Sequence, residues 1–151
     1  MVWGCITRHG PGRLHRITGR LTGAQYVNIL SESFLGTLRD YNLSTEEAFL
    51  QQDNDPKHTC KMTRAWLEDN NITTLPWPAC SPDQNIIEHV WNYIDQRVHS
   101  RTVLPPNLDE LWDALREEWE NMDMEFIVGL YESLPRRTAA LVEAEGGYTK
   151  Y

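Results

Sequence analysis

The chain has 151 residues, of which 40% are hydrophobic and six are tryptophan, which predicts one domain over residues 1–151 with a buried core. Its mean hydropathy of −0.54, and the lack of any apolar run near twenty residues, exclude a membrane-spanning helix. The formal net charge of −8 argues against a self-sufficient nucleic-acid-binding protein, because neutralising phosphates requires lysine and arginine.

The charge is unevenly distributed along the chain. Residues 1–64 hold eight Lys/Arg and six Asp/Glu, a balance of +2, whereas residues 65–151 hold six and sixteen, a balance of −10. Any contact with DNA would therefore come from the basic N-terminal part, from metal ions or from another segment. The acidic stretch over residues 109–125 is more simply interpreted as a solvated helical face.

The cysteines and the N-terminus indicate the compartment. Cys5, Cys60 and Cys80 are far apart and form no CxxC pair. An odd, scattered set favours a reducing intracellular environment over a disulfide framework or a structural zinc site. The first residues show no basic start followed by a long apolar stretch, so no secretory signal is predicted.

The first predicted elements are a β-hairpin and a helix. Val2–Ile6 is predicted as a strand and Leu14–Thr18 as its returning partner, with a break at His9–Gly12. Thr22 and Gln25 form a capping box at the start of the helix. Apolar residues recur behind that box at helical spacing, up to about residue 39: Tyr26, Ile29, Leu30, Phe34 and Leu38.

Two short strands and a helix are predicted in the middle of the chain. Ala48–Gln52 and Ile72–Leu75 are the strands, and Thr59–Asn70 between them is the helix. The helix would direct one apolar face inward, formed by Met62, Ala65 and Trp66. Strands alternating with helices predict a mixed α/β layer fold.

Helices alone are predicted in the rest of the chain. Asn85 with Glu88, and Asn107 with Glu110, are two more capping-box patterns. Apolar stripes follow both, made of Ile87, Val90, Trp91, Ile94 and Val98 in the first helix and of Leu108, Leu111, Trp112, Leu115 and Trp119 in the second.

Two further helices would complete this C-terminal extension. One covers about Met124–Leu134 and stops before Pro135, because proline breaks helical hydrogen bonding. The last ends near Gly146–Gly147, which suits a helix C-terminus. The predicted fold class is therefore α/β with a helical C-terminal extension.

Asp53 is the first candidate functional residue. It ends the strand predicted at residues 48–52, and a carboxylate there can reach the crevice where α/β sheets place their ligands. The alternative is that Asp53 only begins a turn. Asp55 is the better candidate for that structural role, because it precedes Pro56, which suits the first position of a helix. Asp53 is then left to bind a ligand.

Glu88 is the second candidate, separated from Asp53 by 34 residues. It shares the polar face of its helix with Asn92, Asp95 and His99, so it is either exposed or turned toward a cleft. The alternative is a plain capping partner, worth ~1 kcal/mol. One acid at the end of a strand and another on the first turn of a helix suit shared divalent-metal binding, as in a nuclease or strand transferase.

The residues around both acids resemble those of a known family. Residues 51–59 resemble the second-aspartate motif of the mariner superfamily of DNA transposases, and residues 75–91 resemble its third-carboxylate motif. The 34-residue gap matches the subgroup whose third acid is Glu. Residues 2–5, 133–137 and 146–151 also look like this family, so the resemblance covers essentially the whole chain in order. Gln84 and Ile86 depart from the usual Leu and Pro, which touches no catalytic group.

The resemblance implies a ribonuclease-H-like fold of the integrase/transposase type. Its Asp-Asp-Glu triad would hold two Mg²⁺ ions, with Mn²⁺ as a substitute, and Asp53 and Glu88 would be catalytic residues and metal ligands. Two metals ~3.5–4 Å apart would stabilise the attacking and leaving oxygens of an in-line displacement. Mg²⁺ prefers carboxylate and water oxygens, so no Cys/His cluster is needed. A histidine at a helix start is more often structural, and the alternative is that His58 orients a phosphate or the Asp53 loop. Transposon-end and target DNA are the implied partners, and the nucleus the implied location.

The family's first Asp lies on a strand upstream of the block at residues 2–5. We therefore expect the chain to lack that first central strand and its acid, together with the helix-turn-helix region and the basic targeting signal of the family. Asp40, Glu46 and Glu47 have no motif context and do not replace it. Two of three carboxylates predict a weak or inactive nuclease, and two open strand edges predict low stability, a homodimer or a strand-supplying partner.

Three readings follow from these features. The first is a fragment of a DNA transposase catalytic domain, whose family performs metal-dependent strand cleavage and strand transfer. The second is a non-catalytic, co-opted transposase remnant that acts as a protein- or DNA-interaction module, with strand addition at its open edges. The third is an α/β domain without retained activity. Metal binding separates the first from the others, and partner capture separates the second from the third.

Overall fold

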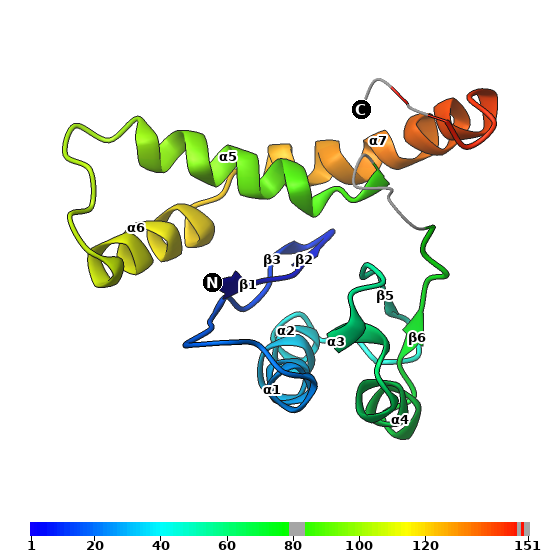
Figure 1. Cartoon of the computed structure of the whole chain (residues 1–151). Helices are drawn as coiled ribbons and strands as arrows, with labels where there is room; N and C mark the ends of the chain where they lie inside the picture. Colours follow the sequence, from blue (N-terminus) through cyan, green and yellow to red (C-terminus); the bar gives the residue numbers. More distant parts are fainter. Residues whose placement is uncertain (79–83, 148, 150–151) are drawn as a thin grey trace. The chain divides into compact units, whose positions relative to one another are not determined.

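The computed structural model describes residues 1–78, 84–147 and 149 (Figure 1). The chain divides into two compact units. Unit 1 holds residues 1–5 and 12–81, and unit 2 holds residues 6–11 and 82–151. Among the described helices, none combines the length and the apolar character that crossing a bilayer requires.

The strands of unit 1 form two short sheets. β1 (Val2–Trp3) pairs antiparallel with β4 (His15–Arg16), and β5 (Phe49–Leu50) pairs parallel with β6 (Thr73–Thr74). The predicted strands are confirmed at all four positions, although each is shorter than expected. Within the described residues, β1 and β5 each pair with one strand only, so each has an edge without a strand partner.

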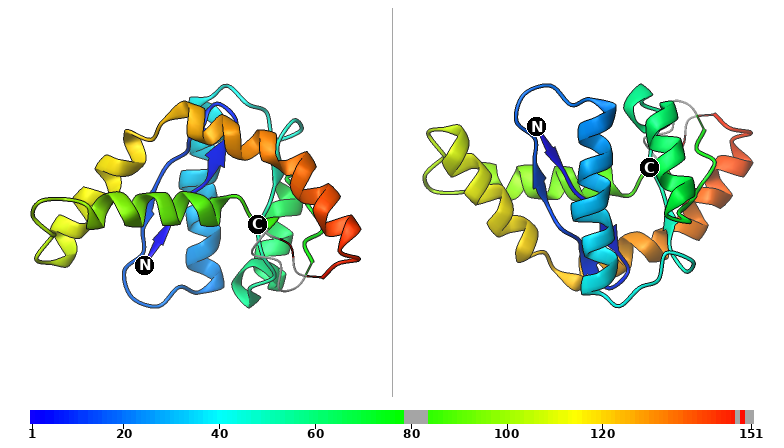
Figure 2. Two further views of the ribbon diagram at one scale, coloured as in Figure 1. Left: turned by 90° about the horizontal axis from the view of Figure 1, so that it is seen from above. Right: turned by 90° about the horizontal axis from the view of Figure 1, so that it is seen from below.

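One continuous helical rod provides the core of unit 1. α1 (Gly23–Ile29), the π-helical segment η1 (Leu30–Phe34) and α2 (Leu35–Asp40) follow one another without a break (Figure 2). The predicted apolar stripe is buried in full, namely Tyr26, Ile29, Leu30, Phe34 and Leu38. Burial of such side chains stabilises the fold by about 1.5–3 kcal/mol each.

The capping box predicted for this rod is confirmed. The Thr22 hydroxyl accepts a hydrogen bond from the Gln25 backbone N–H at 3.3 Å. The Gln25 side-chain oxygen accepts one from the Thr22 backbone N–H at 2.9 Å. Both bonds are local in sequence, which is why the helix start could be predicted.

The helix predicted over Thr59–Asn70 is confirmed with slightly narrower bounds, and a separate short helix precedes it. α3 (Pro56–Thr59) and α4 (Lys61–Asp69) are separated by Cys60, whose backbone is extended at φ −66° and ψ 159°. The Cys60 carbonyl nevertheless accepts the Arg64 N–H at 3.0 Å, so this residue begins α4 from outside the helix. The break lets α3 and α4 run in different directions after β5.

The apolar face predicted for α4 is wrong for two of its three residues, while Trp66 is half-buried and packs against the core. Met62 and Ala65 are exposed, whereas Thr63 and Leu67 are buried. The Thr63 hydroxyl donates a hydrogen bond to the Lys57 carbonyl in α3 at 2.7 Å. This tertiary bond turns a different side of α4 inward, about one residue around the helix from the predicted stripe.

Unit 2 begins with the tip of the hairpin. β2 (Ile6–Thr7) and β3 (Gly10–Pro11) pair antiparallel, so the break predicted at His9–Gly12 is wrong by two residues. The turn is closed by the Thr7 hydroxyl, which donates to the Gly10 carbonyl at 3.2 Å and accepts the His9 N–H at 3.1 Å. Gly10 adopts a φ of +147°, which favours glycine, and this conformation lets the strand resume at once.

Three helices form the body of unit 2: α5 (Ile87–His99), α6 (Leu108–Glu120) and α7 (Met124–Glu143). α5 and α6 lie side by side and antiparallel (Figure 1), with the rings of Trp91 and Trp119 stacked at 5.2 Å. The α5 stripe is confirmed, with Val90, Ile94 and Val98 buried. Leu108 departs from the predicted α6 stripe, since its side chain is 74% exposed at the first residue of the helix.

The ends of these helices confirm one prediction and correct another. The Asn107 side chain caps α6 by accepting the Asp109 and Glu110 N–H groups at 3.0 and 2.9 Å. The predicted break at Pro135 is wrong, because α7 continues through it to Glu143. Buried residues on both sides of Pro135 hold the helix together: Ile127, Leu130, Ser133 and Arg137.

Parts of two predicted segments lie outside the described residues. These are residues 79–83, which include Cys80, and residues 148, 150 and 151 of the C-terminal block. Gly146 is described and has a φ of +81°, as expected of a glycine that follows a helix C-terminus.

Two arginines of α5 and its following loop bind one carboxylate of α6. Arg97 Nε lies 2.7 Å from one oxygen of Glu118, and Arg101 Nη2 lies 2.6 Å from the other. The hydrogen bonds from Arg97 and then Arg101 lower the pKa of Glu118. Because the folded-state pKa is the lower one, this contribution to stability is present above the unfolded pKa and is lost as pH falls through the folded value.

We predict that Glu118→Gln lowers the Tm at pH 7 by about 2–4 °C, the shift that 1 kcal/mol produces in a chain of this size. The variant should also lose part of the acid-induced fall in Tm below about pH 4.5, because it has no carboxylate to protonate. Circular-dichroism melts from pH 3 to 7 measure both effects. Glu120→Gln, an exposed acid of the same helix, is the control and should match the parent chain.

We also predict concentration-dependent self-association through the open edges of β1 and β5. Phe49 on β5 is 64% exposed, so Phe49→Lys should shift the chain toward the monomer in light scattering coupled to gel filtration. Met62→Lys replaces a similarly exposed apolar residue on α4 and should change nothing. A clean monomer of the parent chain at high concentration would contradict this prediction.

Candidate metal-binding and catalytic residues

Asp53 lies between β5 and α3 in unit 1, and its carboxylate is 61% exposed. Oxygen Oδ1 lies 2.6 Å from Nδ1 of His58 and accepts the Asp55 N–H at 3.0 Å. No described residue donates a hydrogen bond to Oδ2. The carboxylate is therefore held through one oxygen and presents the other to solvent.

Asp55 performs the structural role predicted for it. Its side chain accepts the Lys57 backbone N–H at 2.8 Å and binds the Lys57 ammonium at 2.7 Å, and Pro56 is the first residue of α3. The Lys57 hydrogen bonds lower the pKa of Asp55, so it stays ionised as a helix cap. The N-cap residue of α3 is therefore Asp55 and not Asp53.

A tyrosine supports the histidine that holds Asp53. The Tyr26 ring from α1 packs on the His58 ring with centroids 4.3 Å apart. The Tyr26 hydroxyl donates to the Gln52 side-chain oxygen at 2.6 Å. Burial raises the pKa of Tyr26, so the hydroxyl keeps its proton and remains a donor. The sequence showed Tyr26 only as a core residue, because no local pattern signals a partner 32 residues away.

Glu88 lies in unit 2 as the second residue of α5. The predicted capping box with Asn85 is wrong: the helix starts after Ile86, and the Glu88 side chain does not bond to the cap. Asn85 contributes its backbone carbonyl, which accepts the Glu88 N–H at 3.2 Å, and its side-chain oxygen, which accepts the Ile87 N–H at 3.4 Å. The Glu88 carboxylate is exposed and has no ion pair or hydrogen bond within the described part of the chain.

The donor chemistry of these two acids fits a hard divalent cation. Asp53 and Glu88 each leave carboxylate oxygens open to solvent, and such oxygens are the ligands that Mg²⁺ and Mn²⁺ take. Among the described residues, no three of His, Cys, Asp and Glu gather into a group that could hold a metal. Each acid therefore offers a partial ligand set that water, a phosphate or a further acid would complete.

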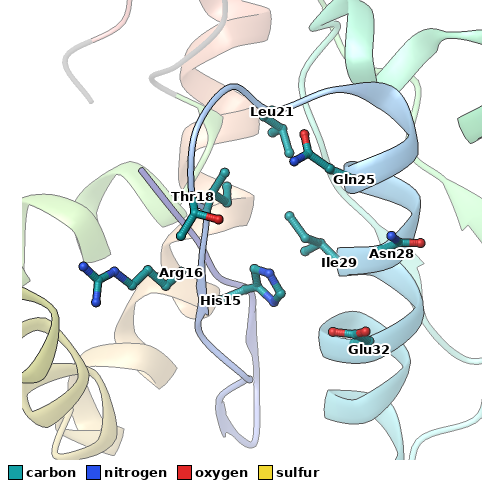
Figure 3. A pocket seen from close by; sticks show the side chains of 9 residues that line it. His15, Arg16, Thr18, Leu21, Gln25, Asn28, Ile29 and Glu32 are labelled. Carbon is teal, nitrogen blue, oxygen red and sulfur yellow. The ribbon is translucent and has the colours of Figure 1, made fainter. Parts of the chain in front are cut away.

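A hollow of about 220 Å³ in unit 1 is separate from Asp53. It lies between β4 and the face of α1 and η1 that carries Gln25, Asn28, Ile29 and Glu32 (Figure 3). Neither Asp53 nor His58 lines it. The candidate metal ligands are thus on an open surface and not in this hollow.

Comparisons with known proteins identify close relatives by sequence. Residues 1–112 match the family described as DDE superfamily endonuclease. The chain is 39% identical to the Tc1 transposase of Caenorhabditis elegans and 37% identical to the Tcb2 transposase of Caenorhabditis briggsae, over its whole length in both cases. It covers 54% of each, so it spans about half the length of the curated relatives that it matches.

The fold is similar to that of a solved transposase domain. The catalytic domain of Mos1 mariner transposase superposes with a TM-score of 0.85 at 21% identity, over 99% of this chain and 75% of that one. This likeness confirms the mixed α/β, ribonuclease-H-like fold class. The Mos1 catalytic domain is also known with Mg and with Mn in the presence of Raltegravir, and Mos1 in a paired-end complex with a left transposon end.

We predict that substitutions of Asp53 and Asp55 change the stability of the chain by different amounts. Asp55→Ala should destabilise the chain by about 1 kcal/mol, because α3 loses its cap. Asp53→Asn should change stability little, because the amide oxygen still accepts from His58 and Asp55. Urea unfolding followed by circular dichroism measures both, and equal losses would show that Asp53 is structural as well.

Proposed function

Because the chain belongs to the DDE superfamily of endonucleases and, within it, to the Tc1/mariner transposases, we propose that it is part of a catalytic domain that cuts and joins DNA strands with divalent metal ions. The observation that carries this proposal is the carboxylate of Asp53, held by His58 through one oxygen with the other open to solvent.

Asp53 and Glu88 are the proposed catalytic residues and metal ligands. When bound, Mg²⁺ or Mn²⁺ would neutralise charge on the attacking and leaving oxygens of a phosphodiester. Asp53 contributes Oδ2, while His58 and the Asp55 N–H keep Oδ1 occupied and the carboxylate plane oriented. Glu88 contributes a carboxylate that forms no helix cap and no ion pair with the described residues, so its oxygens are available to a metal ion.

Transposon ends and target DNA are the proposed substrates, and the nucleus is the proposed location. The complex of Mos1 with a transposon end supports the choice of substrate. With a net charge of −8, this chain has little attraction of its own for phosphates, so metal ions and segments outside the acidic helices would supply the contacts.

On this proposal, a further strand that carries a third acid would pair with the open edge of β1 or β5. With Asp53 and Glu88 alone, the chain should bind metal weakly and cleave DNA poorly, because two carboxylates leave most positions around the cation to water. Clear Mg²⁺-dependent cleavage by the purified chain, lost in Asp53→Asn, would contradict this expectation of weak activity.

The experiment that tests the proposal is a calorimetric titration of the purified chain with Mn²⁺. We expect weak, saturable binding that falls at least about tenfold in Asp53→Asn and in Glu88→Gln, because each removes a charged ligand. Asp95→Asn is the matched control, since Asp95 is exposed on the same helix as Glu88 and should not matter.

Binding that survives in both variants would reject Asp53 and Glu88 as ligands. No binding by the parent chain would reject a metal-dependent function for it. That result would favour a non-catalytic interaction module, for which the open strand edges are a suitable surface.

A further inference from the structure

A buried arginine of α7 reaches the first turn of α5, within unit 2. Arg137 is only 4% exposed. Its Nη2 lies 2.9 Å from Nε2 of His89, and its Nε donates to the Ser133 hydroxyl at 2.8 Å. The Ser133 hydroxyl in turn donates to the Leu130 carbonyl at 2.6 Å. The guanidinium is thus hydrogen-bonded both to Ser133 of its own helix and to His89 of α5.

The chemistry of the two groups decides which one donates and which one accepts in this contact. A guanidinium has donors only and stays protonated in proteins. Nε2 of His89 must therefore accept, which places the ring proton on Nδ1. Removing the acceptor would leave a buried cation short of a partner, an arrangement that proteins avoid because desolvation of a charge is costly. The contact therefore sets both the tautomer and the orientation of the imidazole.

The first turn of α5 starts with a long side-chain hydrogen bond, which the Asn85 side-chain oxygen accepts from the Ile87 N–H at 3.4 Å. Its N-cap residue is Ile86, whose side chain cannot accept a hydrogen bond. Helix starts leave backbone N–H groups without partners, and an ordinary cap normally fixes this turn. Here the Arg137–His89 bond supplies a restraint from α7, whose middle lies beside the start of α5 (Figure 1).

His89 and Glu88 are consecutive residues of this turn. Neighbouring residues of an α-helix point about 100° apart, so their directions are coupled through one rigid turn. A rotation that moved His89 away from Arg137 would move Glu88 as well. Glu88 itself has no described partner that would hold it.

We infer that Arg137, acting through His89, is a positioning residue that sets the direction in which Glu88 is presented to a metal ion. The inference rests on the proposed function, since it assumes that Glu88 is a ligand. It gives a role to one arginine of the pair Arg136–Arg137. The other, Arg136, is exposed and serves as a matched control.

The test is Mn²⁺ titration of the full ¹⁵N-labelled chain, with paramagnetic broadening of the amide signals around Glu88 as the readout. Arg137→Met fills the same space without donors and should raise the Mn²⁺ concentration for half-broadening by about tenfold, the loss typical of a support behind a ligand. Arg136→Met should behave like the parent chain. Circular-dichroism melts confirm that each variant is folded at the assay temperature.

A pair of His89 variants separates positioning from general packing. The Gln side-chain oxygen can take the place of Nε2 as acceptor, whereas the shorter Asn cannot reach Arg137. We therefore expect His89→Gln to retain most of the broadening and His89→Asn to lose it about as Arg137→Met does.

The outcomes separate the two levels of the proposal. No broadening near Glu88 in the parent chain would overturn the proposed function and this inference with it. If the parent chain shows broadening and Arg137→Met shows the same broadening, the inference alone is overturned. The inference alone is also overturned if Arg136→Met loses the broadening as much as Arg137→Met does. If Arg137→Met does not fold, the His89 pair decides, and equal behaviour of its two members overturns the inference.

Discussion

On the proposed function, the central constraint in this protein is that a carboxylate must be held firmly while one of its oxygens stays free. Asp53 meets it with a 2.6 Å contact from His58 to a single oxygen. His58 is in turn packed against Tyr26, whose hydroxyl binds Gln52 beside Asp53. The contacts therefore link the segment after β5 to α3 and α1 and return to the residue next to Asp53. An exposed acid without such support would spread over several rotamers and lose entropy on binding a ligand.

Glu88 meets the same constraint in another way. Its side chain has no hydrogen-bond partner among the described residues. On our inference, its direction is set by the first turn of α5, which Arg137 restrains through the contact with His89. Both acids are therefore supported by a histidine that a second residue holds in place. In one case the histidine touches the acid, and in the other it is the next residue of the same turn.

On the proposed function, the charge of the chain and its strand edges suit a part of a larger catalytic assembly. A balance of −10 over residues 65–151 leaves little attraction for DNA, so divalent cations would offset repulsion as well as take part in chemistry. The edges of β1 and β5 offer backbone donors and acceptors to a further strand.

The sequence by itself determined the features that depend on residues a few positions apart. The Thr22–Gln25 box, the Asn107 cap, the Asp55–Pro56 start of α3 and the buried stripe of α1 to α2 follow from local hydrogen bonding and helical spacing, and the two motifs marked Asp53 and Glu88. Tertiary structure decided the rest. Thr63 bonding to Lys57 chose the buried face of α4, packing on both sides carried α7 through Pro135, and Tyr26 and Arg137 met histidines 32 and 48 residues away. Such contacts depend on how the elements pack, and no local periodicity encodes that.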